Sequence, residues 1–491
     1  MRLISHYSVK KLSNFWKERI LDEDLYQQVF EMAAKENASY ADIRDEDTLY
    51  ASIEVVDGKV TKSMAGSEAG IGIRLLIDGA WGFSYGSKEN FKDVFKMAVS
   101  AQKTSKTLSK STIELAEVKP IQDKITISQK KSSQDIPFEE KMKLVLTVDK
   151  HLRDEENKIK ATRTNYVDFL RRQTVATSEG TLIHEERPYT YMAMTPTAKK
   201  GTDTNQARAR AGHVGGFDIF DTVDVVKRAD ETQKRAIAGL EAKAVKAGKY
   251  QVVLDGSLNF LFAHEAAGHS TEADFLRTAG VLRGKLGKTL AQNFVNLIDD
   301  GSLEYVPNYG ARTFGFMKYD DEGVPVERTE LIKDGVLKTY LTDRTSAAHF
   351  NLKPSGNCRA EFYSSFPIVR MRNTFLEASK GKELSEEEVL GQIKDGLLLK
   401  RGGGGQVDPI RGTFNFGVGE VYEIHNGEIG ELRKATTLSG NTLETLGKIM
   451  GISNVMSDPS ANVGFCGKDG QSAPTGTGAG WMSVKVMTVG G

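Results

Sequence analysis

Apolar and polar residues alternate over residues 20–110 in a way that predicts a small α+β unit. Acidic residues followed by apolar positions at helical spacing predict an amphipathic helix over 21–37. The next segments alternate with a period of two around the pairs Asp57-Gly58 and Asp78-Gly79. Such pairs favour type I′ turns because both central residues adopt positive φ. With a second helix over 89–107, the unit is predicted as helix, four hairpin strands, helix.

A second unit is predicted over residues 113–248, again α+β. The expected elements are a helix at 137–157, strands at 159–170, 173–178 and 181–194, and a long helix at 222–247. Between the last strand and the last helix, residues 198–216 are basic, polar and glycine-rich. This composition favours a solvated loop, with a mobile flap over a site as the alternative.

From residue 249 to residue 491, short apolar strands alternate with glycine-containing turns. After one strand and one helix near its start, this pattern predicts a large β-rich domain. The predicted fold is therefore an α+β N-terminal half followed by a large β-rich, barrel or sandwich-like C-terminal domain. The predicted domain bounds are 20–110, 113–248 and 249–491.

Charge and composition exclude several classes of protein. The 66 Lys and Arg balance 66 Asp and Glu, so the formal net charge is zero, which argues against direct binding to nucleic acid. Two cysteines cannot build a disulfide framework. No apolar run approaches the roughly 20 residues that span a bilayer, and the first 20 residues lack a signal-peptide core. We therefore expect a cytoplasmic protein without a membrane segment.

The segment His264-Glu265-Ala266-Ala267-Gly268-His269 carries the most informative chemistry. Two histidines that flank a glutamate in a predicted helix indicate a metal site. The histidines are five residues apart, however, and five steps of 100° leave them about 140° apart on a regular α-helix. Both can bind one ion only if the helix widens into a π-turn or ends between them, and Gly268 permits either.

A catalytic zinc ion needs three protein ligands and one open position, so a third ligand has to be found. Cys466 is the better candidate of the two thiols, because flanking glycines let the backbone approach a metal and Lys468 would favour a thiolate. Cys358 lies beside a predicted strand and is expected to be a buried small residue.

Three carboxylates near the histidines have predicted roles. Glu265 follows the first candidate ligand directly, which makes it the natural general base for a metal-bound water. Glu272 and Asp274 lie just past His269. Each can be a fourth ligand, a partner that orients an imidazole, or part of a plain polar loop, and these alternatives stay open.

Several motifs together resemble one family. HEAAGHSTEADF, RGGGGQVDP, FNFGVGEVYEI and GFCGKDGQSAPTGTG occur in the order found in the TldD/PmbA family, named for modulation of DNA gyrase, and GIGIRLLIDGAWGFSYGS matches its N-terminal domain. The resemblance covers nearly the whole chain. Because HExxxH is kept, the chain resembles the TldD branch, a zinc metallopeptidase.

This resemblance implies roles for individual residues. In the TldD branch the two motif histidines and the cysteine hold zinc and the glutamate is catalytic, which corresponds to His264, His269, Cys466 and Glu265 here. The resemblance also implies action on unfolded peptides or proteins, and a dimer, either with a second copy or with a PmbA-type relative.

The leading hypothesis is a zinc-dependent metallopeptidase that hydrolyses unfolded or extended peptides, with Glu265 as general base on zinc-bound water. Two rivals remain open. In one, Cys466 is a nucleophile activated by a histidine, and the enzyme survives removal of the metal. In the other, the chain is a non-catalytic binding or regulatory module with structural zinc.

Overall fold

The computed structural model describes residues 22–108, 111–153 and 157–490. Residues 1–20, in which no signal peptide was predicted, lie outside this range. So do residue 21, the first of the predicted helix 21–37, and residues 154–156, which belong to the predicted helix 137–157. Within the described residues, no helix is both long and apolar enough to cross a bilayer.

The N-terminal unit has helices at both ends and strands between them. It consists of α2 (Glu23–Lys35), β1 (Tyr40–Val56), β2 (Lys59–Ile77), β3 (Ala80–Gly86) and α3 (Phe91–Leu108). Both turn dipeptides have the positive φ expected of type I′ turns: Asp57 50°, Gly58 76°, Asp78 50° and Gly79 69°. The prediction of four strands was wrong, because the unit has three strands, each of them continuous.

The central unit follows the predicted order in part: the strands predicted at 159–170 and 173–178 are one continuous strand, and the last predicted helix ends at Glu241. Its main elements are β4 (Gln122–Thr126), α4 (Phe138–His151), β5 (Ile159–Thr177), β6 (Leu182–Lys200), α5 (Ile219–Thr222) and α6 (Val225–Glu241). The prediction of a loop at 198–216 was wrong. Two strands in it, β7 (Asp203–Gln206) and β8 (Ala209–His213), pair antiparallel with β6. Ala211 is fully buried opposite Met192. A small apolar residue therefore lies on the buried face of a strand in a segment whose overall composition is polar.

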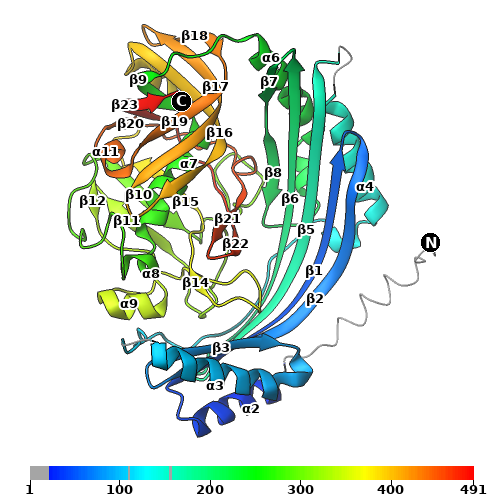
Figure 1. Ribbon diagram of the computed structural model, residues 1–491, viewed down its shortest axis with the longest axis vertical. Coiled ribbons are helices and arrows are strands. Elements are labelled where there is room, and N and C mark those ends of the chain that lie inside the picture. The colour runs from blue at the N-terminus through cyan, green and yellow to red at the C-terminus, as the bar shows by residue number, and fades with distance from the viewer. Residues whose placement is uncertain (1–21, 109–110, 154–156, 491) are drawn as a thin grey trace.

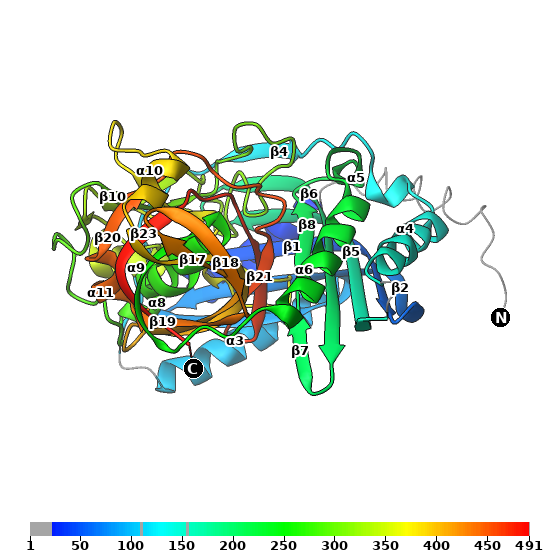
Figure 2. The same cartoon turned by 90° about the horizontal axis from the view of Figure 1, so that it is seen from above.

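One sheet of eight strands joins these two units. Its order is β3-β2-β1-β5-β6-β4, with β7 and β8 also paired to β6. The long strands curve past the C-terminal domain, and α2 and α3 lie at one end (Figure 1). Helices α4 and α6 cover the side of the sheet away from that domain (Figure 2). The division of the chain into three domains stays a prediction.

The C-terminal region contains a closed five-stranded barrel. The ring runs β16-β9-β23-β19-β17 and closes through pairing of β16 with β17, while β18 and β20 pair on its outside. The bounds are β9 (Gly248–Leu254), β16 (Asp395–Asp408), β17 (Thr413–His425), β18 (Glu428–Arg433), β19 (Thr436–Asn441), β20 (Ile449–Ile452) and β23 (Met482–Val489). The predicted fold class, α+β followed by a β-rich domain, is therefore confirmed.

Smaller sheets and short helices complete this domain. A four-stranded sheet contains β10 (Val295–Asp300), β11 (Arg328–Lys333), β12 (Val336–Leu337) and β15 (Thr374–Ala378), and two-stranded pairs are β13 (Cys358–Arg359) with β14 (Ile368–Val369) and β21 (Gly464–Lys468) with β22 (Gln471–Thr475). The α-helices are α7 (Gly256–Leu261), α8 (Ala273–Leu276), α9 (Arg344–Phe350), α10 (Glu386–Gly391) and α11 (Thr442–Leu446).

Buried ion pairs connect the sheet to the C-terminal domain. Arg74 on β2 contacts Asp42 on the neighbouring strand at 2.6 Å and Glu322 of the C-terminal domain at 2.9 Å, all three side chains being almost fully buried. Arg344, buried at the start of α9, binds the partly exposed Glu179 at 2.7 Å. Since unpaired buried charges are costly, these pairs fix how the two parts meet.

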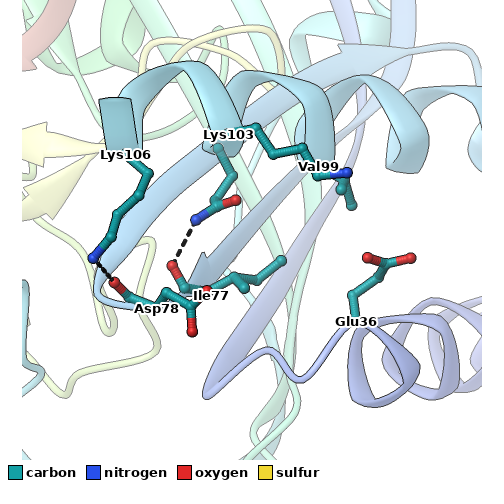
Figure 3. A pocket seen from close by; sticks show the side chains of 7 residues that line it. Glu36, Ile77, Asp78, Val99, Lys103 and Lys106 are labelled. Carbon is teal, nitrogen blue, oxygen red and sulfur yellow. Dashed lines mark hydrogen bonds between the residues drawn. The ribbon is translucent and has the colours of Figure 1, made fainter. Parts of the chain in front are cut away.

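A hollow of about 300 Å³ lies at the end of the N-terminal unit, between α3 and the turn that joins β2 to β3. Two hydrogen bonds join α3 to the end of β2 and the turn after it: Lys106 Nζ donates to the Asp78 carbonyl, and the Gln102 side chain donates to the Ile77 carbonyl (Figure 3). None of the predicted site residues lines it.

Candidate metal centre

The first motif histidine lies on a π-helix, and the second directly follows it. Helix α7 continues as the π-helix Phe262–Gly268 (η3), and a 3₁₀ turn, His269–Thr271 (η4), follows. The backbone N–H of His269 donates to the carbonyl of His264, a hydrogen bond across five residues. This widening puts residues five apart on the same side, and the two imidazole centroids lie 5.2 Å apart. Of the two arrangements the spacing required, the π-turn is the one present.

Neighbouring side chains stabilise the irregular helix. The carbonyl of Ala266 accepts hydrogen bonds from the hydroxyls of Ser270, at 3.0 Å, and Thr442, at 2.9 Å. These donors satisfy a backbone group that a regular helix would pair internally. Gly268 packs closely on Met371, since a Cβ at residue 268 would lie 2.1 Å from the Met371 sulfur. The glycine therefore lets the helix approach the chain next to β15.

Cys466 reaches the histidines from a β-hairpin. Strands β21 and β22 are joined by a turn at Asp469 and Gly470, whose φ angles are 50° and 75°. The Cys466 sulfur lies 3.3 Å from His269 Nε2. Arg370 donates a hydrogen bond to the Cys466 carbonyl and fixes the strand. Cys358 is fully buried on β13 and takes no part in this cluster.

The donor set fits a transition metal. One atom each from His264, His269 and Cys466 lies within 4.8 Å of the other two. Zinc–ligand distances of about 2.0–2.3 Å place tetrahedral ligands closer than about 4 Å to one another, so small adjustments suffice. Among the described residues, buried His264 Nδ1 has no hydrogen-bond partner. Two imidazoles and a thiolate are ligands that zinc prefers.

The histidines also set the charge of the thiol. Burial alone would raise the pKa of Cys466, but His264 and His269 outweigh it and lower the pKa to about 4. Burial opposes protonation of His269, whereas Glu272 and Cys466 raise its pKa well above the usual value. The cluster therefore pairs a thiolate with imidazoles, and binding of a metal would release the imidazole protons.

Glu272 contacts an imidazole and Asp274 contacts a lysine. His269 Nδ1 donates to Glu272 at 2.9 Å, and the carboxylate also lies 3.3 Å from Lys468. Despite burial, Lys468 and His269 lower the pKa of Glu272 to about 2. Asp274 accepts two 2.8 Å hydrogen bonds from Lys468, although burial still raises its pKa to about 6. Of the three roles left open for Glu272, this geometry favours the orientation of an imidazole.

Lys468 was predicted to favour the Cys466 thiolate, but its hydrogen bonds go to other groups. Its ammonium group donates to Asp274 and to the Val369 carbonyl, both at 2.8 Å. The histidines, and not this lysine, favour the thiolate. Arg370, which holds the Cys466 carbonyl, was missed at the sequence level because an isolated arginine on a distant segment carries no local signal.

Glu265 lies beside the donors and is partly exposed. Its carboxylate is 3.7 Å from His269 Nε2, and 23% of its side chain is exposed. Glu272 has only 3% of its side chain exposed. Glu265 is thus the more accessible of the two acids that contact the His269 ring.

The chain matches the sequence models of a known family. Sequence models of the PmbA/TldA metallopeptidase match the chain in order: domain 1 at residues 41–102, the central domain at 131–240 and the C-terminal domain at 247–491. The class of the protein is therefore a metallopeptidase. More specifically, the chain belongs to the PmbA/TldD family, and the predicted resemblance to TldD-type members is confirmed.

Individual relatives span nearly the whole chain. A metalloprotease of Methanocaldococcus jannaschii is 37% identical over 91% of this chain and 96% of its own length. A metalloprotease of Methanothermobacter thermautotrophicus is 34% identical over 94% and 97%. A zinc metalloprotease TldD homolog of Saccharolobus solfataricus is 29% identical over 92% and 97%.

Solved structures share the fold. One from Thermotoga maritima, named for modulation of a DNA gyrase, superposes with a TM-score of 0.75 at 20% identity, covering 96% of this chain and all of the other.

Proposed function

We propose that this metallopeptidase is zinc-dependent, that His264, His269 and Cys466 hold the zinc, and that it hydrolyses extended or unfolded peptides. The observation that carries the proposal is the cluster of three donor atoms beside a partly exposed glutamate. Three protein donors leave one of the four usual zinc positions open, as catalytic sites require and closed structural sites do not. The relative named a zinc metalloprotease supports the choice of metal.

The chain's own residues divide the remaining work. When bound, zinc would polarise the scissile carbonyl and lower the pKa of water at the site. Glu265 takes the proton from the attacking water and passes it to the leaving amine. Glu272 accepts the hydrogen bond from His269 Nδ1, which fixes the ring so that Nε2 faces Cys466.

The backbone around Cys466 supports an extended substrate. Gly464 and Gly467 flank the cysteine, and a Cβ at either residue would meet no atom within 4 Å. A peptide backbone can therefore approach this strand closely. Extended chains offer free backbone groups for such contact and folded chains do not.

The decisive experiment compares metal content and hydrolysis of a denatured protein substrate. We expect His264→Ala and Cys466→Ser to lose both metal and activity. Glu265→Gln should keep the metal and lose about 10²–10⁴-fold in rate, the usual contribution of a general base. Cys358→Ala is the matched thiol control and should keep both. Full activity of zinc-loaded Glu265→Gln would refute the mechanism.

The 3.3 Å contact between Cys466 and His269 also favours the second candidate, a cysteine hydrolase. Chelation distinguishes the two, because a cysteine hydrolase keeps its activity without metal and the proposed zinc enzyme loses it. Bound zinc with no turnover of any unfolded substrate would instead indicate a binding module with structural zinc.

A further inference from the structure

Phe465 is an exposed aromatic side chain directly before the candidate ligand Cys466. The exposed fraction of Phe465 is 40%, whereas that of Cys466 is 8%. Successive side chains of a strand point to opposite faces, so Cys466 faces the histidines and Phe465 lies on the other face of β21. Single apolar residues are common on protein surfaces, and the surroundings of this one therefore decide whether it has a role.

The Phe465 ring ends a row of aromatic rings that begins in the large sheet. Tyr191 on β6 and Phe314 lie edge-on to it, with ring centroids 5.4 and 5.5 Å away. Phe314 also contacts Tyr189, which stacks on Phe169 of β5 at 4.6 Å. Tyr189 and Phe314 are buried, and β21 lies between the barrel and the large sheet (Figures 1 and 2). The rings beneath Phe465 therefore hold it in place as a fixed aromatic surface.

Gly467 leaves open space beside this ring. It lies two residues after Phe465 on the same strand, so the two residues share a face of β21. A Cβ at residue 467 would meet no atom within 4 Å. A side chain from another strand can therefore lie over Gly467 and pack against the Phe465 ring.

The free edge of β21 presents the backbone of these same two residues. Among the described residues, β21 pairs only with β22. Phe465 lies opposite Pro474, whose nitrogen carries no hydrogen, and Gly467 lies opposite Ser472, whose N–H donates to Glu361. Bonded and non-bonded pairs alternate in antiparallel strands. The N–H and C=O groups of Phe465 and Gly467 therefore point away from β22, toward the free edge.

We propose that Phe465 selects substrates that carry an apolar or aromatic residue next to the residue that faces the metal centre. In a strand pair, directly opposite residues share a face, with Cβ atoms about 4.5–5.5 Å apart. The substrate residue opposite Phe465 would thus lie against its ring, and the next substrate residue would turn to the face of Cys466. This inference rests on the proposed function and adds to it a preference for one side chain.

The position of cleavage tests the proposal. In a series of serine-rich peptides, a single phenylalanine moves by one residue from each peptide to the next, and mass spectrometry maps the cleaved bond. With the zinc-loaded wild-type chain, the cleaved bond should move together with the phenylalanine. At low concentration these peptides should be cleaved about tenfold faster than an all-serine peptide, a usual discrimination by an apolar contact. A cleaved bond that stays fixed overturns the proposal, whereas no cleavage of any peptide contradicts the proposed function.

Removal of the ring should abolish the preference. Phe465→Ala should raise KM for the phenylalanine peptide about tenfold without lowering kcat, because the ring contacts a part of the substrate that does not react. Phe465→Leu keeps an apolar surface and should keep most of the preference. Ile429→Ala, at an exposed residue of β18, is the matched control and should change neither constant. A Phe465→Ala chain that loses zinc, or whose kcat falls equally for both peptides, overturns the proposal because the ring would then only support the structure.

Peptide binding gives a readout that does not depend on turnover. With zinc-loaded Glu265→Gln, fluorescence anisotropy should show that the labelled phenylalanine peptide binds about tenfold more tightly than the serine peptide. Phe465→Ala in the same chain should remove this difference. Equal affinities of the two peptides for Glu265→Gln overturn the proposal, whether or not the wild-type chain hydrolyses them.

Discussion

His269 and Glu272 are joined through the side of the imidazole that faces away from the metal cluster. His269 Nδ1 donates to Glu272 at 2.9 Å, while Nε2 lies 3.3 Å from the Cys466 sulfur. The carboxylate thus fixes both the tautomer and the orientation of the ring, as acidic partners of metal-binding histidines commonly do.

Removal of this carboxylate should weaken metal binding. We expect Glu272→Ala to lower zinc affinity by about 10- to 100-fold, as loss of such partners usually does. Competition with a chromophoric chelator measures the affinity. Asp274→Asn is the matched control, because Asp274 binds Lys468 and not an imidazole, and its loss should be smaller. Equal affinities for wild type and Glu272→Ala would contradict an orienting role.

The close packing of Gly268 leads to a second prediction. Gly268→Ala would place a Cβ 2.1 Å from the Met371 sulfur and should destabilise the protein by about 1–3 kcal/mol, the usual cost of overpacking. Thermal unfolding measures the change. Met371→Ala in the same chain should recover part of the loss that Gly268→Ala causes.

A glycine with free space is the control for this variant. A Cβ at Gly391 would meet no atom within 4 Å, so Gly391→Ala should change stability by less than about 0.5 kcal/mol. If Gly268→Ala were as harmless as Gly391→Ala, close packing would not explain the glycine in the motif.

Local patterns predicted the turns but not the length of the strands. Asp-Gly pairs determine their own φ angles, so both hairpin turns of the N-terminal unit could be predicted from neighbouring residues alone. The polar run around Arg44 and Glu46 lies inside one continuous strand, β1. Both side chains are buried, since Arg44 donates to the carbonyls of Phe362 and Ser365 and Glu46 pairs with Arg171. Partners that lie far away in the sequence made a polar run compatible with a buried strand.

For the candidate metal centre too, local sequence predicted some features and not others. The histidine spacing required a widened or ended helix, and the structure has the widened form. Cys466 could be proposed because its flanking glycines are a local signal. Arg370 and Met371, which support the hairpin and the π-helix, have no such signal, and only the folded chain brings them there.

A buried ion pair between β10 and the chain just before β15 should make stability depend on pH. Asp299 and Arg372 are fully buried and 2.7 Å apart. Burial alone would raise the pKa of Asp299, but Arg372 and further hydrogen bonds lower it below its ordinary value of 3.8. A lowered acid pKa stabilises the fold above the unfolded value, and this stabilisation is lost as the pH falls through the folded value.

Asp299→Asn should therefore cost about 3–5 kcal/mol at neutral pH, because it leaves a buried guanidinium without its counter-charge. In denaturant unfolding across a pH series, the gap to wild type should narrow below pH 3.8, where the wild-type carboxylate begins to lose its advantage. Glu327→Gln removes an exposed pair with Lys353 and should change stability little at any pH. A gap that is constant with pH would contradict this account.

Metal removal should change the reactivity of one thiol and not the other. Alkylation requires a free thiolate, so zinc bound to Cys466 would block it and chelation would expose it. Cys466 is 8% exposed, whereas Cys358 is fully buried and burial raises its pKa well above the usual value. Peptide mapping by mass spectrometry after treatment with iodoacetamide should therefore find Cys466 labelled only in chelated protein and Cys358 in neither form.

The ligand variants sharpen this last test. His264→Ala should leave Cys466 reactive even with zinc in solution, because the remaining two donors hold the ion weakly. Glu265→Gln should protect Cys466 as wild type does, since its proposed role is in proton transfer and not in binding. Equal labelling of Cys466 with and without zinc would show that the sulfur is not a ligand, and would leave the thiolate and His269 as the pair to examine for nucleophilic chemistry.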